Sequence, residues 1–198
     1  GVDVNHAGAE STKTAIYWAA QRGFSNLVQL LILRKADVNL GMTQGSLYTP
    51  LHVAADGDVV RLLCLAKAEL HREGSLGDSP LDCAAKAGRV EPVQALIECG
   101  ANLKQTRPSD GTCALYMAAQ NGHAAVVRVL LDAKAPVDQR RCGGDSPLYI
   151  ACRYGHAEVA GMLVDAKADV NKVFKGVSAV KVAKHYNQPG VEEILKRT

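Results

Sequence analysis

The sequence has no long apolar run, and this absence limits where the chain can work. No stretch approaches the ~18 consecutive apolar residues of a membrane-spanning helix, and no basic-then-apolar leader marks a signal peptide. Charge is nearly balanced, with 23 basic and 20 acidic residues and a net charge of +3. That balance argues against a polybasic nucleic-acid binder. We therefore expect no membrane insertion and no nucleic-acid partner.

The six cysteines lack the spacing of a metal site. No C-x-x-C pair occurs, and no Cys/His cluster has zinc spacing. An even count also permits disulfides, but four cysteines lie among Leu, Ile and Ala, where a thiol behaves as a small buried hydrophobe. These four are Cys64, Cys83, Cys99 and Cys152. The pattern favours reduced thiols and an intracellular protein, without distinguishing cytoplasm from nucleus.

Recognisable catalytic chemistry is also missing. No phosphate-binding loop occurs, because Gly143-Gly144-Asp145 has the composition of a turn. No pairing of a nucleophile with a base, and no convergent pair of carboxylates, can be argued from the spacing. We therefore expect no enzyme activity, no cofactor and no metal in this chain.

What the sequence does contain is an internal repeat. Five segments of seven residues follow one pattern. Each begins with a small or polar residue, continues with Pro or Ala and an aliphatic residue, and ends with two small residues. A sixth segment follows the pattern less closely. The six segments are Thr14–Ala20, Thr49–Ala55, Ser79–Ala85, Cys113–Ala119, Ser146–Cys152 and Ser178–Lys184. A second pattern, such as Ala36-Asp-Val-Asn39, ends at positions 39, 71, 104, 138 and 171, which are 32, 33, 34 and 33 residues apart. Each unit thus spans about 33 residues.

Local chemistry predicts two short helices in each unit. Thr or Ser before Pro favours a helix start, because the hydroxyl accepts from free backbone N–H groups and Pro fits the first turn. Val126, Val127, Leu130 and Leu131 share one apolar helical face, and Gly122 breaks the chain before them. First helices should begin near Thr14, Thr49, Ser79, Cys113, Ser146 and Ser178, and second helices near Ser25, Asp58, Val90, Ala124 and Ala157. Neither helix can bury its apolar face alone, so the units must stack.

On these motifs the chain resembles the ankyrin repeat. Thr49–Ala54 matches the T-P-L-H-x-A signature of that 33-residue repeat, and Gly122–Leu131 carries Gly-His-x-x-Val-Val-x-x-Leu-Leu. The resemblance implies an all-α ankyrin-repeat solenoid of stacked helix-turn-helix units with β-hairpin finger loops. We expect one domain over residues 1–198, with the tail of a preceding repeat at 1–5, repeats at 6–39, 40–71, 72–104, 105–138 and 139–171, and a C-terminal capping repeat at 172–198.

Two departures from the family pattern carry predictions. Ala55 precedes Val60 by five residues, whereas Ala119 precedes Val127 by eight, so repeat 2 is three residues short and its first helix should end early. Natural drift and a notch shaped for a partner both remain open as explanations.

The second departure replaces the family's glycine after the second helix. Lysine stands there in four repeats, at Lys35, Lys67, Lys134 and Lys167. We expect left-handed backbone at these lysines, which costs roughly 1–2 kcal/mol and is partly offset by the negative end of the helix dipole. These four lysines either are solvated residues at helix ends or form a row of side chains with a function.

The resemblance also implies a binding groove lined by the fingers and by outward residues of the first helices. The helix positions that map to it are Gln21, Arg22, Lys86, Gln120, Asn121, Arg153, Tyr154, His185 and Tyr186. Tyr17, Tyr116 and Tyr149 replace the histidine of the motif; they either serve an interface or pack between repeats with only the hydroxyls exposed.

The later fingers are basic and the first is uncharged. The basic residues assigned to them are Lys104, Arg107, Arg140, Arg141, Lys172 and Lys175. Their acids, Asp110, Asp138 and Asp145, are expected toward the finger bases. An acidic partner would explain this charge, as would generic solubilising charge.

We therefore expect a non-catalytic protein–protein interaction module, a scaffold or adaptor, that binds a protein or extended peptide of acidic character. It should be a monomeric array within a longer chain. The alternative is a regulatory or substrate-recruiting arm of a larger enzyme or ubiquitin-ligase adaptor, which the flanking domains would distinguish.

Overall fold

The computed structural model describes residues 3–7, 12–41 and 47–196, and in these residues the chain forms twelve helices and one two-stranded hairpin. Contacts divide the chain into two units. Unit 1 holds Gly1–Ala84 and Arg89–Asn102, and unit 2 holds Ala85–Gly88 and Leu103–Thr198. The prediction of a single domain stays a prediction.

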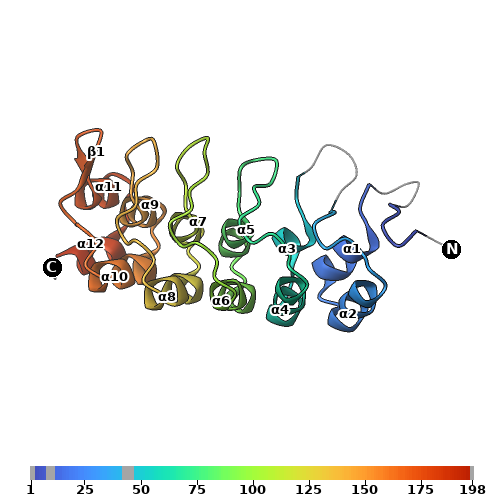
Figure 1. Ribbon diagram of the computed structural model, residues 1–198. Helices are drawn as coiled ribbons and strands as arrows, with labels where there is room; N and C mark the ends of the chain where they lie inside the picture. The colour runs from blue at the N-terminus through green and yellow to red at the C-terminus, as the bar shows by residue number, and fades with distance from the viewer. Residues whose placement is uncertain (1–2, 8–11, 42–46, 197–198) are drawn as a thin grey trace. The chain divides into compact units, whose positions relative to one another are not determined.

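In unit 1, first helices and second helices form separate rows (Figure 1). α1 (Ala15–Arg22) packs against α3 (Pro50–Val53). α2 (Ser25–Leu33), α4 (Gly57–Leu65) and α6 (Val90–Glu98) pack in sequence order in the second row. α5 (Pro80–Lys86) crosses the division between the units.

Unit 2 repeats the same arrangement (Figure 1). α7 (Ala114–Gln120), α9 (Pro147–Tyr154) and α11 (Ala179–His185) form the first row. α8 (Ala124–Asp132), α10 (Ala157–Asp165) and α12 (Pro189–Leu195) form the second. The paired valines and the following leucine of α8 are fully buried, as the apolar spacing predicts.

The predicted helix starts are confirmed. The first helices begin one residue after their predicted caps, at Ala15, Pro50, Pro80, Ala114, Pro147 and Ala179. The second helices begin at Ser25, Gly57, Val90, Ala124 and Ala157. The hydroxyls of Thr14 and Ser146 accept the backbone N–H three residues later, at 3.3 and 3.2 Å, so capping fixes these starts locally.

The early end of the first helix in repeat 2 is also confirmed. α3 has four residues, and Ala54 leaves it with φ −49° and ψ 124° instead of a left-handed turn. One terminal nitrogen of Arg89 donates to the carbonyl oxygens of Val53 and Ala54 at 2.9 and 3.0 Å. At the equivalent place in the longer first helices α5 and α7, a histidine makes the contact that Arg89 makes with α3. The Nε2 atoms of His123 and His156 lie 3.0 and 3.1 Å from the carbonyl oxygens of Lys86 and Gln120.

The four predicted left-handed lysines are confirmed. Lys35, Lys67, Lys134 and Lys167 have φ of 63°, 64°, 66° and 70°. In the remaining full repeat Gly100 takes the same place with φ 93°. The lysine side chains are exposed, which agrees with solvated residues at helix ends.

The fingers turn back on themselves by short backbone hydrogen bonds. The N–H of Gly74 donates to Asp78 at 2.8 Å, and the N–H of Arg107 donates to Thr112 at 2.8 Å. Among the described fingers, only the last has paired strands, β1 (Val173–Phe174) and β2 (Val177–Ser178), antiparallel with Val173 opposite Ser178. Residues 42–46, in the finger of repeat 2, lie outside the described residues.

Candidate functional site

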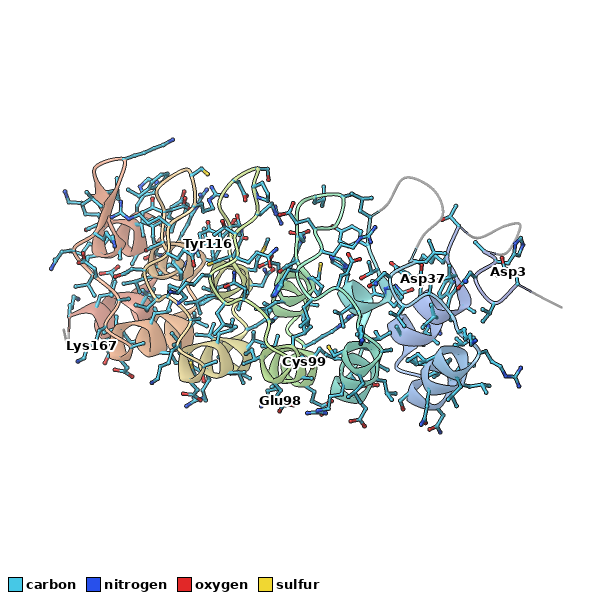
Figure 2. All side chains as sticks on the ribbon, viewed as in Figure 1. Asp3, Asp37, Glu98, Cys99, Tyr116 and Lys167 are labelled. Atoms are coloured by element: carbon cyan, nitrogen blue, oxygen red, sulfur yellow. The ribbon has the colours of Figure 1, made fainter. Side chains whose placement is uncertain are left out.

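In unit 2, a buried carboxylate holds two of the residues predicted to bind a partner. The hydroxyl of Tyr116 (labelled in Figure 2) donates to Oδ2 of Asp145 at 2.5 Å, and Nε of Arg141 donates to Oδ1 at 3.0 Å. The Arg141 guanidinium also lies 5.3 Å from the centre of the Tyr116 ring. Burial, and then the hydrogen bond to Asp145, raises the pKa of Tyr116. This cluster joins repeats 4 and 5, and it places Tyr116 inside the protein instead of at a binding surface.

A second acid, Asp110, pairs with two of the three arginines that were predicted at the fingertips. Arg107 and Arg141 each lie 3.7 Å from a carboxylate oxygen of Asp110. Burial works to raise the pKa of Asp110, but hydrogen bonds from Thr112 and the two arginines outweigh it and lower that pKa. The acids thus neutralise two of the three arginines, because a guanidinium on a long stem reaches the carboxylates below it. Arg140 is exposed.

Other predicted residues come together on the first row of unit 2. The Arg153 guanidinium lies 5.9 Å from the ring centre of Tyr154 and 5.4 Å from that of Tyr186. Tyr154 is 51% exposed and Tyr186 43%. Two large rings with polar tips therefore flank one exposed cation at the ends of α9 and α11. Such a surface combines apolar area with a site for an anion.

The last finger continues this surface. The rings of Tyr149 and Phe174 meet edge-on, with centres 5.1 Å apart and an interplanar angle of 77°. Nζ of Lys175 lies 5.4 Å from the centre of the Phe174 ring. Burial raises the pKa of Tyr149, and nearby Arg153 acts in the opposite direction. The His185 ring meets that of Tyr186 edge-on, with centres 4.9 Å apart. We call the whole set the aromatic–basic surface: Tyr149, Arg153, Tyr154, Phe174, Lys175, His185 and Tyr186.

The remaining predicted residues lie elsewhere. In unit 1, Tyr17 is buried at 5% exposure, and the Arg22 guanidinium lies 5.7 Å from the Trp18 ring. In unit 2, Lys86 and Asn121 are exposed and Gln120 is half-buried. No described contact joins these three to the aromatic–basic surface. Burial of Tyr17 and Tyr116 agrees with the alternative that such tyrosines pack between repeats.

Charge is sorted between the two rows of unit 2. The first-row helices α7, α9 and α11 contain no Asp or Glu. Their basic residues are Arg153, Lys181, Lys184 and His185. The second-row helices contain one base, Arg128, against Asp132, Glu158, Asp165, Glu192 and Glu193. The aromatic–basic surface therefore lies on the first row of helices, where the absence of acidic residues makes the electrostatic repulsion of an anion weakest.

The prediction from sequence missed two features. Phe174 was not among the candidate residues, although it is an aromatic residue in a finger, beside Lys175. An exposed apolar face on α1 and α2 was also missed, consisting of Trp18, Phe24, Leu27, Leu30 and Leu33. Its signal is that every residue of 27–33 except Gln29 is apolar, whereas a helix covered on one side needs only a single apolar stripe.

Within the described residues, no group of three or more His, Cys, Asp or Glu side chains could hold a metal ion. In the same part of the chain, no helix combines the length and apolar content that a membrane crossing requires.

Known proteins resemble this chain in part of their length. Ankyrin repeat and SOCS box protein 11 from Homo sapiens is 33% identical over 125 residues, covering 61% of this chain and 36% of that protein. E3 ubiquitin-protein ligase XBAT33 from Arabidopsis thaliana is 34% identical over 100 residues, covering 49% and 20%. Tyrosine-protein kinase Shark from Drosophila melanogaster is 33% identical over 102 residues, covering 50% and 11%. The chain thus spans about a third or less of each of these relatives.

The family model for ankyrin repeats in three copies matches residues 1–73, 16–107 and 81–173. These overlapping matches cover most of the chain and coincide with the helix pairs described above. Ankyrin repeats are a non-catalytic fold that binds proteins. The chain belongs to the ankyrin-repeat family.

Proposed function

We propose that unit 2 binds an acidic peptide or acidic protein segment on its aromatic–basic surface. The observation that carries this proposal is Arg153, an exposed cation flanked by two exposed tyrosine rings on a row of helices without acids. A planar guanidinium binds a carboxylate through two parallel hydrogen bonds. The partner's neighbouring apolar groups would pack on the rings of Tyr154 and Tyr186.

The two kinds of contact should contribute differently. Burial of a tyrosine ring in an interface contributes most to complex lifetime, because such rings are frequent hot spots. Exposed cations such as Arg140 and Lys175 lie at the rim, where each ion pair contributes no more than about 1 kcal/mol. These rim charges should mainly increase the association rate and make it dependent on salt.

A peptide-display selection on the immobilised chain tests the proposal. We expect selected peptides to be enriched in Asp and Glu next to an apolar residue. Arg153→Glu and Tyr154→Ala should each weaken binding of the best peptide at least about tenfold. The matched control is Arg128→Glu, an exposed arginine on α8 of the same unit, which should change affinity less than about twofold. Neutral peptides, or equal losses in Arg153→Glu and Arg128→Glu, would contradict the site.

We also propose that the chain works as one part of a longer protein. The relatives support this, because a kinase and a ubiquitin ligase each extend well beyond the matched repeats. In unit 1, Oδ1 of Asn5 accepts the N–H of Asp37 at 2.8 Å, and Oδ1 of Asn39 accepts that of Glu69 at 2.9 Å. Asn5 thus makes the contact by which one repeat's tail joins the next, as the predicted tail of a preceding repeat should.

Under this proposal, a preceding repeat covers the apolar face of α1 and α2. Sequencing the complete transcript tests it: an upstream helix pair of the same pattern supports the proposal. An upstream sequence without one contradicts it. A catalytic or SOCS-box region in the same transcript would favour the recruiting role, and its absence would favour a scaffold.

A further inference from the structure

The second row of unit 1 brings two cysteines together. Cys64 lies in the last turn of α4. Cys99, labelled in Figure 2, is the C-cap residue that directly follows α6. Both side chains line one cavity, and the Cys99 thiol acts on the pKa of the Cys64 thiol. The sequence gives no hint of this pair, because the 34 residues at positions 65–98 separate its members. α4 and α6 are second helices of neighbouring repeats and pack against each other.

The pair is open to small reagents. Cys64 and Cys99 are both half-buried, whereas Cys113 and Cys152 are buried. Together with Arg61, Leu65, Leu70 and Glu98 they line a cavity of about 380 Å³. One terminal nitrogen of Arg61 lies 3.0 Å from a Glu98 carboxylate oxygen, so an ion pair closes one side of this cavity. A molecule as small as a hydroperoxide fits this space.

The Cys64 thiol is hard to deprotonate. Burial, and then the hydrogen bond to Cys99, raises the pKa of the Cys64 thiol to about 12. Cys64 therefore keeps its proton at neutral pH. This arrangement favours Cys99 as the sulfur that reacts first and Cys64 as the partner that resolves the product.

We propose that Cys64 and Cys99 are an oxidation site at which a hydroperoxide forms a reversible disulfide between repeats 2 and 3. The Cys99 thiolate attacks the terminal peroxide oxygen, the O–O bond breaks, and the alcohol or water leaves with a proton. The Cys99 sulfenic acid is then attacked by the Cys64 sulfur, which releases its proton, and water leaves. Two thiols and one hydrogen peroxide thus give one disulfide and two waters. A small dithiol reverses the reaction by two exchange steps.

A metal site is the competing use of two thiols. Zinc sites in proteins need three or four protein ligands. Within the described residues, no group of three His, Cys, Asp or Glu side chains that could hold a metal ion includes this pair. Oxidation requires only two sulfur atoms.

Peptide mapping tests the proposal directly. The reduced chain is treated with hydrogen peroxide at low protein concentration, capped with iodoacetamide and digested with trypsin without reduction. We expect one linked product, Leu62–Lys67 joined to Val90–Lys104, whose mass is two hydrogens below the sum of the peptides. Dithiothreitol should separate it. Because the link constrains the unfolded chain, the oxidised protein should melt about 5–10 °C higher.

Matched variants make the result specific. Cys64→Ser and Cys99→Ser should each abolish the linked product and the rise in Tm. Cys83→Ser removes another half-buried cysteine and should change neither. The proposal is overturned if the wild type yields no such link at peroxide levels that oxidise Cys99, or if Cys99 proceeds to sulfinic acid while Cys64 stays a free thiol.

Discussion

Asp78 in unit 1 and Asp145 in unit 2 occupy the same place in their repeats, directly before Ser-Pro, and each is 3% exposed. The units hold them differently. In unit 1, the Tyr48 hydroxyl donates to the Asp78 carboxylate at 3.0 Å, and Nε2 of His52 lies 3.1 Å from its carbonyl oxygen. In unit 2, the Asp145 carboxylate accepts both hydrogen bonds, one from the Tyr116 hydroxyl and one from Nε of Arg141.

The difference arises at the fourth position of the repeat motif. His52 is short, so its Nδ1 accepts the Thr49 N–H at 3.1 Å and its Nε2 reaches the next repeat's backbone. Because a carbonyl can only accept, Nε2 carries the hydrogen and the ring is neutral. Tyr116 is too long to close the helix cap and extends to the next repeat's carboxylate. The same position thus joins neighbouring repeats through two chemistries with opposite pH dependence.

The largest expected effect is acid sensitivity at His52. Burial is the main cause that lowers its pKa from 6.5 to about 4. Between these values the unfolded chain binds the proton and the folded chain does not, so stability is full above pH 6.5 and falls as pH decreases toward 4. The loss should be on the order of 3 kcal/mol. Urea unfolding at pH 7 and pH 4 measures it.

His52→Gln is the matched variant for the acid prediction. Gln at the third helical position can still accept the cap N–H but does not titrate. We expect its stability to fall less between pH 7 and pH 4 than that of the wild type. An identical fall in both proteins would show that His52 does not cause the acid sensitivity.

Tyr116→Phe should have the next largest effect. It removes a hydrogen bond to a buried carboxylate, which should lower the free energy of unfolding by about 1–3 kcal/mol. Tyr149→Phe is the matched control, because Tyr149 occupies the same motif position but is half-buried; its effect should be under about 0.5 kcal/mol. Chemical denaturation at neutral pH measures both. Equal losses would mean that ring packing, not the link to Asp145, distinguishes the two tyrosines.

At alkaline pH, we expect Tyr116 instead of His52 to make the stability of the chain depend on pH. The pKa of Tyr116 is raised above its ordinary value of 10 in the folded chain. The unfolded chain therefore loses this proton first, and stability should fall as pH rises above 10. Tyr116→Phe should lack that part of the loss, whereas His52→Gln should retain it. Unfolding curves at pH 9 and pH 11 distinguish them.

The smallest expected effect concerns the residue after each second helix. Lys134→Gly should stabilise the chain by roughly 0.5–1 kcal/mol, because glycine has no Cβ penalty at φ 66°. Gly100→Lys should destabilise it by roughly 1 kcal/mol. Nothing lies within 4 Å of a Cβ at Gly100, so this change isolates backbone strain from packing. Thermal melts measure both. Changes of the same sign in the two variants would contradict the strain argument.

The features predicted from sequence are those that a few neighbouring residues determine. The caps at Thr14 and Ser146 follow from local chemistry. The short α3 and the left-handed lysines follow from comparing each repeat with the family pattern. What could not be predicted depends on which side chains meet between repeats. The link from Tyr116 to Asp145 spans 29 residues, and the Cys64–Cys99 pair spans 35. No periodicity in the sequence specifies such pairs.

The link between Arg89 and α3 makes the short helix depend on a residue of the next repeat. A neutral imidazole at position 89 would offer a single N–H, whereas one Arg89 nitrogen serves both carbonyls that the shortened helix leaves. Restoring three residues to repeat 2 would remove that need, and replacing Arg89 alone would expose it. We therefore expect the stability effects of lengthening repeat 2 and of replacing Arg89 to be non-additive, because both changes act on the same two carbonyl groups.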